Sequence, residues 1–348
     1  MTRPSTFAQR IIRWQRSHGR HTLPWQKTRD PYRVWLSEIM LQQTQVATVQ
    51  RYYEPFLRRF PRVTDLAAAS LDEVLGMWSG LGYYSRARNL HRCAIVVTQE
   101  RAGAFPTHSA DLARLPGIGR STAAAIAAFC FGERVAILDG NVKRVLARAF
   151  AFDADLSEVR NERELWALAH ALLPRTGIES YSQGLMDLGA ITCVSRNPAC
   201  ESCPVRAGCV AAATGMQHHY PVKSKRSRRG AREHVWPILV WRGQVWLERR
   251  PEHGVWAGLW SLPEFDSVQT FDRVSTGWPG RAESLPSFVH ALTHLDWTLH
   301  PVRWSFPART SAARMSGVVA QWPRGRWFSF DDARALGLPA PLRTLLLG

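Results

Sequence analysis

The sequence contains no long hydrophobic run. Its longer apolar stretches, such as residues 123–130, fall far short of the roughly 20 residues that a membrane-spanning helix needs. The N-terminal region carries Arg10, Arg13 and Arg16 but lacks the apolar segment of a secretory signal peptide. We therefore expect a cytoplasmic protein that has no membrane partner.

Acidic side chains are also scarce. The 348 residues include 28 Asp and Glu against 45 Lys and Arg, which gives a formal net charge of +17. This excess says nothing about the fold, but it predicts attraction to a polyanion. An anionic membrane surface is the main alternative, and no polybasic amphipathic helix supports it. Nucleic acid is thus the favoured class of partner.

Cysteine is limited to six residues, and in an intracellular protein we expect no disulfide framework. Cys93 and Cys130 lie in apolar helical contexts and are predicted to be core residues. The other four fall within 17 residues and can converge on one soft metal centre: Cys193, Cys200, Cys203 and Cys209. Their spacing alone allows a structural zinc ion or a [4Fe–4S] cluster, and the alternative is four buried thiols without a ligand.

The texture of the sequence changes near residue 220, which predicts a multidomain protein. Residues 1–220 have the pattern of an all-α domain. Residues 221–232 have the composition of an exposed linker, because basic side chains alternate there with Ser and Gly. Residues 233–348 hold ten of the 15 tryptophans, and they begin with short runs in which apolar and polar residues alternate. Both features favour a smaller α+β domain. The basic residues of the linker are Lys223, Lys225, Arg226, Arg228, Arg229 and Arg232.

Individual elements can be predicted from the spacing of apolar residues. In the first region this spacing indicates helices and no convincing strand. In the second region, alternating runs at 235–241 and 244–249 flank Arg242-Gly243 and predict a β-hairpin. The predicted helices cover residues 33–53, 70–80, 85–101, 121–131, 141–150 and 162–173.

A Leu-Pro-Gly-Ile-Gly segment at 115–119 precedes one of these helices. Gly117 and Gly119 permit a tight turn and a close backbone approach, and the N–H groups of the following helix can bind a phosphate. A plain turn between helices is the alternative. Asp139 follows 20 residues after Gly119 and directly precedes another predicted helix, where its simplest role is an N-cap.

Glu38 is the single acid of an otherwise uncharged segment at 35–46. Because its neighbours are apolar, burial would raise its pKa, and a carboxyl with a raised pKa can act as a general acid near neutral pH. The commoner alternative is an exposed glutamate on an amphipathic helix. Gln42 and Gln43 follow closely, and their amides can donate hydrogen bonds to DNA and accept them from it.

Taken in order along nearly the whole chain, these segments resemble the helix–hairpin–helix DNA glycosylases of the endonuclease III type, and the MutY-type adenine DNA glycosylases in particular. The resemblance implies an all-α helix–hairpin–helix domain with a [4Fe–4S] loop, and a smaller α+β domain similar to MutT-type hydrolases. It implies that the cluster is structural and that Arg196 and Arg206 of its loop face DNA. The matching segments are 23–25, 30–32, 35–46, 80–90, 115–119, 139–141, 181–189 and the four cysteines.

The resemblance also implies roles for single residues. Glu38 would protonate adenine N7 and help position or activate water. Asp139, supported by Asn141, would stabilise the cation that forms at the sugar or bond it transiently. Trp25 and Gln183 would line the pocket of the flipped adenine. Tyr83 and Gln42 would insert into the duplex as wedges. The residues for which the resemblance implies contacts to DNA or to the lesion are Gln42, Gln43, Thr44, Tyr83, Gly117, Gly119, Ser121, Thr293 and His294.

Some features of related enzymes are missing. Ser121 stands where strand-cutting enzymes of the endonuclease III type carry a lysine, and a serine cannot form a Schiff base. Segment 254–263 resembles the MutT-type hydrolases, but their closely spaced acids are missing, so no Mg²⁺ cage is expected. Leu292 replaces the aromatic residue of a Phe-Ser-His lesion contact, whereas Thr293 keeps a hydroxyl. His294 fits either that contact or a packed core position.

The sequence thus predicts a monofunctional glycosylase of base excision repair that removes adenine opposite 8-oxoguanine or guanine. We expect a monomer that acts on double-stranded DNA with such mispairs, at the nucleoid of a bacterium. One alternative is an endonuclease III-like glycosylase and lyase for oxidised pyrimidines, which Ser121 and the second domain disfavour. Another is a lesion-binding protein without catalysis, which the presence of Glu38 and Asp139 disfavours.

Overall fold

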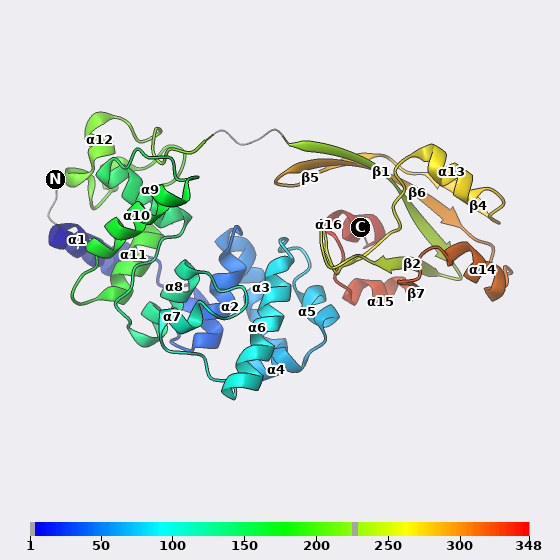
Figure 1. Ribbon diagram of the computed structural model, residues 1–348, viewed down its shortest axis with the longest axis horizontal. Coiled ribbons are helices and arrows are strands. Elements are labelled where there is room, and N and C mark those ends of the chain that lie inside the picture. Colours follow the sequence, from blue (N-terminus) through cyan, green and yellow to red (C-terminus); the bar gives the residue numbers. More distant parts are fainter. Residues whose placement is uncertain (1–3, 225–228, 348) are drawn as a thin grey trace. The chain divides into compact units, whose positions relative to one another are not determined.

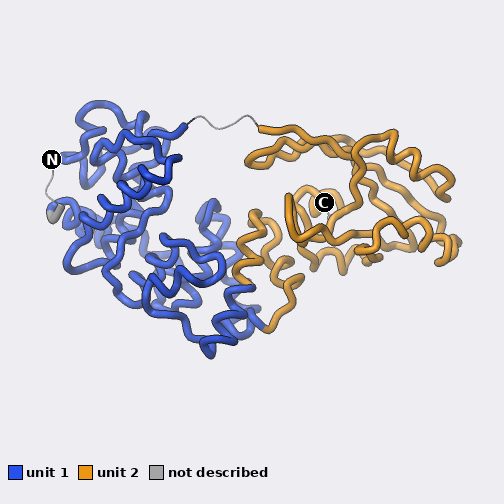
Figure 2. The backbone as a smooth tube through the Cα atoms, viewed as in Figure 1, with its two compact units in different colours: residues 1–67, 92–226 blue, residues 68–91, 227–348 orange. Residues whose placement is uncertain are grey.

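The computed structural model describes residues 4–224 and 229–347, and the chain divides into two compact units (Figure 2). The first unit combines residues 1–67 and 92–226, and the second combines 68–91 and 227–348. The grouping of 68–91 with the C-terminal residues was not suggested by sequence composition. Lys225, Arg226 and Arg228 of the predicted linker lie outside the described residues.

The first unit is helical, and its described residues contain no strand, as the sequence predicted (Figure 1). Helix α6 (Ser85–Arg101) begins in the second unit and ends in the first. The other elements are α1 (Pro4–His18), η1 (Pro24–Gln26), α2 (Pro31–Leu41), α3 (Val46–Arg59), α4 (Val63–Ala68), α7 (Ser109–Leu112), α8 (Arg120–Phe131), α9 (Gly140–Phe150), α10 (Val159–Ala171), α11 (Ile178–Ile191), η2 (Cys200–Ser202), η3 (Arg206–Gly208) and α12 (Val210–Thr214).

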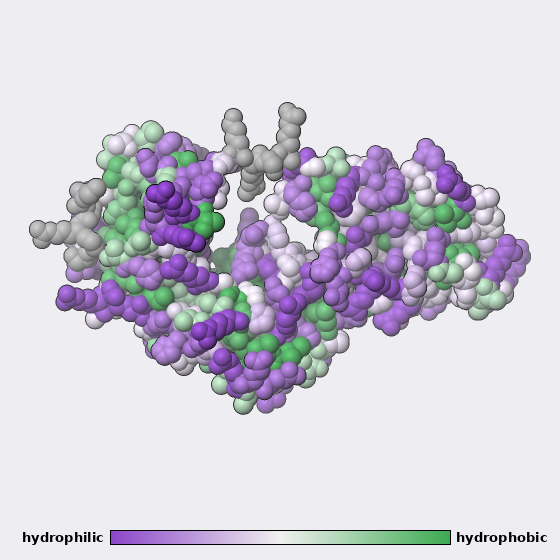
Figure 3. All heavy atoms as spheres, viewed as in Figure 1, coloured by the Kyte–Doolittle hydropathy of each residue, from purple (hydrophilic) through white to green (hydrophobic). Residues whose placement is uncertain are grey.

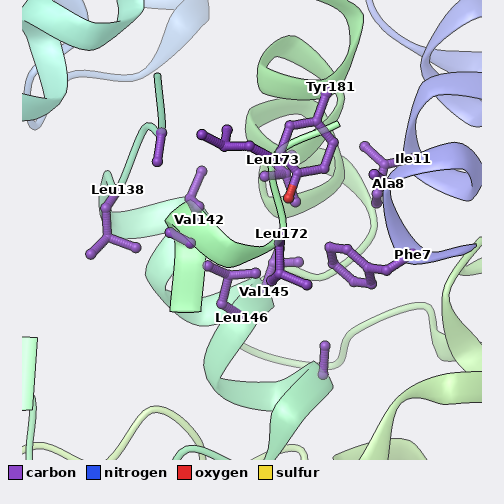
Figure 4. Packing of buried hydrophobic residues seen from close by; sticks show 14 of the residues in the cluster. Phe7, Ala8, Ile11, Leu138, Val142, Val145, Leu146, Leu172, Leu173 and Tyr181 are labelled. Atoms are coloured by element: carbon purple, nitrogen blue, oxygen red, sulfur yellow. The ribbon is translucent and has the colours of Figure 1, made fainter. Parts of the chain in front are cut away.

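A hydrophobic core joins α1, α9, α10 and α11 (Figure 4). In α9, Val142, Val145, Leu146 and Ala149 recur at helical spacing, and all are buried, so this face of the helix points into the core. Gly189 lets α11 come close to α9, since a Cβ at position 189 would lie 2.6 Å from the Cβ of Asn141. The core therefore fixes the start of α9, where Asp139 is located, against α11.

The predicted helix 33–53 is wrong in one respect: the structure divides it into α2 and α3. Helix α2 ends at Leu41, and α3 begins at Val46 after Gln45, whose backbone is extended. Gln43 between them has a φ of 56°, a left-handed conformation that interrupts a right-handed helix. Periodicity continues across this turn, which is why the sequence pattern did not reveal it.

The remaining helix predictions are largely confirmed. Helix α6 has the predicted limits, α8 and α9 each begin one residue earlier, and α10 begins at Val159 rather than at 162. Helix α5 (Leu71–Met77) is shorter than predicted, with Ser70 as its N-cap. Apolar spacing did not predict α1 or α11. Gly184 and Gly189 break up the apolar pattern of α11, although both are buried where this helix packs closely.

The second unit is built on a mixed sheet with strand order β3-β2-β1-β6-β4, to which β5 adds beside β6 and β7 beside β2. Strands β1 and β6 are parallel, and the other pairs are antiparallel. Besides α5, the elements are β1 (Gly230–Trp241), β2 (Gln244–Arg249), β3 (Trp260–Ser261), α13 (Val268–Ser275), β4 (Arg281–Ser284), β5 (Phe288–Ala291), β6 (Leu295–Ser305), α14 (Ala312–Val319), β7 (Gly325–Ser329), α15 (Phe330–Ala335) and α16 (Ala340–Leu347).

The predicted hairpin is confirmed, and Trp241 of β1 faces Gln244 of β2. Arg242 and Gly243 both have positive φ, 50° and 74°. A two-residue turn with this backbone matches the right-handed twist of the two strands that it connects. Strand β1 begins at Gly230, earlier than the alternating run indicated. The fold class predicted from the sequence, a helical domain followed by a smaller α+β domain, is thereby confirmed.

Residues 68–91 are held within the second unit by polar contacts. Asp72 pairs with Arg249 at 3.0 Å, the Tyr84 hydroxyl donates to the carbonyl of Leu338 at 2.8 Å, and Arg88 Nη1 donates to the carbonyl of Ala257 at 2.6 Å.

On the displayed face of each unit, hydrophilic residues prevail, and smaller areas of hydrophobic residues lie among them (Figure 3). In the described ranges, no helix combines the length and apolarity needed to cross a membrane.

Candidate active site

A cavity of about 330 Å³ opens in the first unit among the segment before α2, α2 itself, α9 and α11. Its volume lies within the range of protein pockets that bind small molecules. The cavity is lined by six of the predicted site residues, which are far apart in the sequence: Trp25, Glu38, Thr44, Asp139, Asn141 and Gln183.

Glu38 lies on α2 and turns toward the cavity. The helix starts at Pro31 behind an Asp30 cap, whose Oδ1 accepts a hydrogen bond from the Tyr32 N–H at 2.9 Å. Trp35 and Ile39 on neighbouring faces of the helix are buried and Glu38 itself is partly buried, so it is not the exposed surface residue of the alternative interpretation. Burial raises the pKa of Glu38 to about 8, and the nearby charge of Asp139 adds to this increase.

Asp139 is the N-cap of α9, as its position in the sequence suggested. Its Oδ1 accepts a hydrogen bond from the Val142 N–H at 2.7 Å. The same side chain lines the cavity, so capping and a place in the site are compatible. Burial raises the pKa of Asp139, although backbone N–H groups and the charges of Arg144 and Lys143 oppose this effect.

Arg144 connects the cavity with the cysteine segment. Its Nη2 donates to Asn141 Oδ1 at 2.8 Å and to the carbonyl of Gly189 at 2.7 Å. Its Nε donates to the carbonyl of Cys193 at 2.8 Å. Arg144 therefore fixes Asn141 and joins the start of α9 to the end of α11. Sequence reasoning missed this residue, and no local pattern distinguishes it from a solvated arginine.

The four clustered cysteines line one small cavity in the first unit, and none forms a disulfide. Buried Arg148 holds their loop by donating to the carbonyls of Val194, Ser195 and Gln217 at 2.7, 3.0 and 2.8 Å. Across residues 4–224 and 229–347, no group of three or more His, Cys, Asp or Glu side chains is arranged to hold a metal ion. Outside the loop, Cys93 is buried, as predicted, and Cys130 is partly buried.

Two arginines of the cysteine loop are exposed, as a contact with DNA would require. Arg196 lies on the surface, and Arg206 also does so while pairing with Glu201.

The Leu-Pro-Gly-Ile-Gly segment forms a tight turn before α8. Gly117 has a φ of 74°, a conformation that favours glycine, and Gly119 is the N-cap of α8. Gly119 has no side chain that could cap this helix start, so the backbone N–H groups there suit an anion. Ser121 lies outside the lining of the cavity, and its Oγ accepts a hydrogen bond from the Leu138 N–H at 3.1 Å.

Gln42, Gln43 and Thr44 lie on the turn between α2 and α3 rather than on a helix face. Gln43 is exposed, and Thr44 lines the cavity. Gln42 Nε2 lies 3.4 Å from Thr122 Oγ1 on α8. The turn thus runs from the cavity wall to the protein surface, which single-helix periodicity did not predict.

In the second unit, Tyr83 and Thr293 lie side by side, although 210 positions separate them. The Tyr83 hydroxyl is 3.3 Å from Thr293 Oγ1, and both side chains are exposed. Tyr83 has a φ of 48°, and the guanidinium carbon of Arg86 lies 5.5 Å from its ring centroid. His294 follows on the turn between β5 and β6 and is exposed, so its interpretation as a packed core residue is wrong.

Further residues of the cavity were not anticipated. Arg29 and Glu179 form an ion pair at 2.9 Å at its margin, and His21 and Gln26 contribute to the wall. Arg20 also lines it and pairs with buried Asp187. These residues come from α11 and from the segment before α2, and nothing in their local sequence distinguishes them.

Family models match both parts of the chain. Residues 36–170 match the model described as "HhH-GPD superfamily base excision DNA repair protein", which contains the turn before α8 as well as Glu38 and Asp139. Residues 235–348 match the model of the NUDIX domain. Together the two matches explain why a helical unit and a sheet occur in one chain.

Similar proteins and structures agree with these matches. The adenine DNA glycosylase of Buchnera aphidicola subsp. Schizaphis graminum is 34% identical over 98% of this chain and 97% of its own length. The human adenine DNA glycosylase is 35% identical over 94% of this chain and 71% of its own length.

Solved structures resemble the helical part. A thermostable thymine-DNA glycosylase is 30% identical, with a TM-score of 0.55 over 61% of this chain and 97% of its own. An endonuclease III–DNA complex, 20% identical over 62% of this chain and all of its own, with a TM-score of 0.53, shares the fold. The site geometry, the two family models and the full-length likeness lead to one conclusion: the chain belongs to the family of adenine DNA glycosylases.

Proposed function

We propose that this adenine DNA glycosylase removes adenine paired with 8-oxoguanine or guanine, and that the cavity of the first unit holds the flipped base. One observation carries the proposal: two carboxyl groups from distant parts of the chain, Glu38 and Asp139, line one base-sized cavity together with Trp25 and Gln183. An aromatic ring and an amide are the groups with which proteins stack on an extruded base and bind its edge.

The raised pKa of Glu38 supports its role as the general acid. When the bond between C1′ and N9 breaks, its electron pair leaves with the base, and the proton of Glu38 neutralises the base at N7. Asp139, as a carboxylate, stabilises the positive charge that develops at C1′. Water then adds to C1′, and its proton returns to Glu38. The products are free adenine and an abasic site.

A cut in the DNA strand is not part of the proposal. Ser121 has no amine, and its hydroxyl is engaged with the Leu138 N–H. The nearest candidate amine in the sequence, Lys143, pairs with Glu162 at 2.9 Å. Lys143 is also not one of the residues that line the cavity. The abasic site should therefore be left intact.

We further propose that Tyr83, Thr293 and His294 contact the 8-oxoguanine strand. Their exposure and the closeness of the Tyr83 and Thr293 hydroxyls support a shared contact surface. Gln42, Gln43 and the glycines of the turn before α8 are proposed to bind the DNA around the extruded nucleotide.

The four cysteines are proposed to hold a [4Fe–4S] cluster. Four thiols around one cavity supply the donor set that such a cluster uses. The donor set alone also suits zinc, and the resemblance of the cysteine segment to endonuclease III-type glycosylases favours the cluster. Cys193, Cys200, Cys203 and Cys209 would be its ligands, and its contribution would be to fix the surrounding loop rather than to react.

The proposed partner is a DNA duplex, bound by a monomer at the nucleoid in the bacterial cytoplasm. The net charge of +17 supports binding to phosphates. Affinity for duplex should fall steeply with salt, because each neutralised phosphate releases counterions. An affinity that does not depend on salt would contradict this binding mode.

One assay tests substrate and reaction type together. Duplexes with A:8-oxoguanine, A:guanine or an oxidised pyrimidine are incubated with the protein and analysed with and without alkali. The proposal expects strand breaks from the two adenine duplexes only after alkali. Breaks without alkali would identify a lyase, and activity on the oxidised pyrimidine alone would favour the endonuclease III-like alternative.

A further inference from the structure

Asp187 is a buried carboxylate beside the cavity for which the proposed reaction provides no role. It is fully buried on α11 and does not belong to the cavity lining. Its Oδ1 accepts hydrogen bonds from Arg20 Nε at 2.7 Å and from Gln183 Nε2 at 2.9 Å, and its Oδ2 accepts from the Arg20 N–H at 3.0 Å. Its position one helical turn after Gln183 puts both side chains on one face of α11.

This arrangement determines which end of the Gln183 amide, the NH₂ group or the oxygen, forms the hydrogen bond with Asp187. An ionised carboxylate only accepts hydrogen bonds, so it binds the NH₂ group of a glutamine and never its oxygen. Both oxygens of Asp187 already accept from donors of Arg20, so the carboxyl group acts as an acceptor toward Gln183 as well. Gln183 Oε1 is then the end of the amide left for a ligand in the cavity, which this side chain lines.

The chemistry of purines makes that orientation selective. Adenine carries an amine at C6, which donates a hydrogen bond, whereas hypoxanthine and guanine carry a carbonyl there, which accepts one. An amide oxygen fixed toward the base pairs with the amine and meets the carbonyl with repulsion. We propose that Asp187 is a positioning residue that sets the preference for adenine by fixing the amide of Gln183.

The backbone is shaped to allow this contact. Gly19 precedes Arg20, and a Cβ at position 19 would lie 3.2 Å from Asp187 Oδ2 and 2.5 Å from the carbonyl oxygen of Gln15. A larger residue would push the Arg20 N–H away from the carboxylate. The glycine, the arginine and the aspartate thus form one structural unit behind Gln183.

The inference rests on the proposed use of the cavity for the flipped base, and a double-mutant cycle tests it. Single-turnover excision is measured for adenine and for hypoxanthine, each opposite 8-oxoguanine. The ratio of the two rate constants is independent of the active fraction of the protein. Asp187→Asn allows the Gln183 amide to turn over, so this ratio should fall about tenfold, the size expected when one hydrogen bond to a base is reversed.

The second half of the cycle uses Gln183→Met. Methionine has no amide for Asp187 to orient, so Asp187→Asn should change the ratio by less than about twofold in this background. Asp65→Asn is the matched control, because Asp65 also accepts from the backbone and side chain of an arginine, but this arginine, Arg62, does not line the cavity as Arg20 and Gln183 do. It should leave the ratio unchanged.

An equal loss in both backgrounds would overturn the inference, since a general structural defect does not depend on the amide. An unchanged ratio in Asp187→Asn alone would also overturn it. If that variant does not fold, Gln183→Met removes the amide directly, and a ratio unchanged from the parent protein would contradict the idea. Should the unmodified protein release neither base, the proposed function fails; if it releases adenine normally, only the role of Asp187 is in question.

Discussion

The cavity of the first unit and the exposed Tyr83–Thr293 cluster of the second unit use polar side chains in opposite ways. Glu38 and Asp139 lie in a cavity, where loss of water raises the pKa of both carboxyls. Tyr83 and Thr293 are exposed, and stacking or hydrogen bonding does not require burial. Under the proposed function, burial prepares the two carboxyl groups for chemistry, whereas accessible side chains on tight turns serve recognition.

The largest expected effect concerns the cavity. Glu38→Gln should reduce single-turnover release of adenine at least about 1,000-fold, the contribution typical of a general acid, because glutamine supplies no proton. Duplex affinity should change by no more than about threefold, since the side chain keeps its shape. Quench-flow assays and fluorescence anisotropy measure the two quantities.

The control for this prediction is Glu164→Gln, which alters an exposed glutamate of α10. It should leave both the rate and the affinity unchanged. Near-full activity of Glu38→Gln would contradict the role of Glu38 as the general acid. It would also contradict the idea that burial in the cavity prepares this side chain for chemistry.

The exposed cluster should affect recognition more than chemistry. Tyr83→Ala should weaken binding of an 8-oxoguanine duplex about 5- to 100-fold, the range for the loss of one base–aromatic stack. Tyr83→Phe keeps the ring and loses only the hydroxyl next to Thr293, so about a twofold effect is expected. Measurement in the Glu38→Gln background prevents turnover. Equal losses in both Tyr83 variants would show that the hydroxyl pair, and not stacking, supports binding.

The pH dependence of the rate tests the burial of Glu38 directly. Only its protonated form can act as an acid, and burial raises its pKa to about 8. The single-turnover rate should therefore be flat below pH 8 and fall about tenfold for each further pH unit. A rate that already falls near pH 5 would mean that Glu38 titrates like an exposed carboxyl. Binding by the exposed cluster should not follow this profile.

The smallest effect is on stability. Because the folded state raises the pKa of Glu38, it binds the proton more tightly than the unfolded chain does, and stability is lost as pH rises through the interval from 4.5 to about 8. Glu38→Gln should raise Tm by a few degrees, about 2–8 °C, at pH 9 and much less at pH 4. Differential scanning calorimetry at both values checks this. An equal gain at both would point to packing instead of ionisation.

Sequence patterns predicted elements better than their breaks. Residues 33–53 have an amphipathic pattern throughout, so the sequence did not predict the turn at Gln43. This turn places Gln42 and Thr44 outside a helix. Helix α11 escaped because glycines at close helix contacts look like helix breakers in the sequence. Gln183 was identified through family resemblance, while its partner Asp187 was missed, because a carboxylate four residues away on a helix usually faces solvent.

The sequence by itself determined the fold class, the hairpin and the cysteine group, because these depend on local spacing, turn chemistry and residue type. Glu38 and Asp139 were singled out mainly by the resemblance to known glycosylases. Only the tertiary structure decided that Glu38 and Asp139 line one cavity and that the hydroxyls of Tyr83 and Thr293 lie close together. The same is true of the contact between Arg20 and Asp187 beside Gln183. Such contacts join residues more than 100 positions apart. They arise when buried helices and strands pack, and no local pattern of a single segment encodes them.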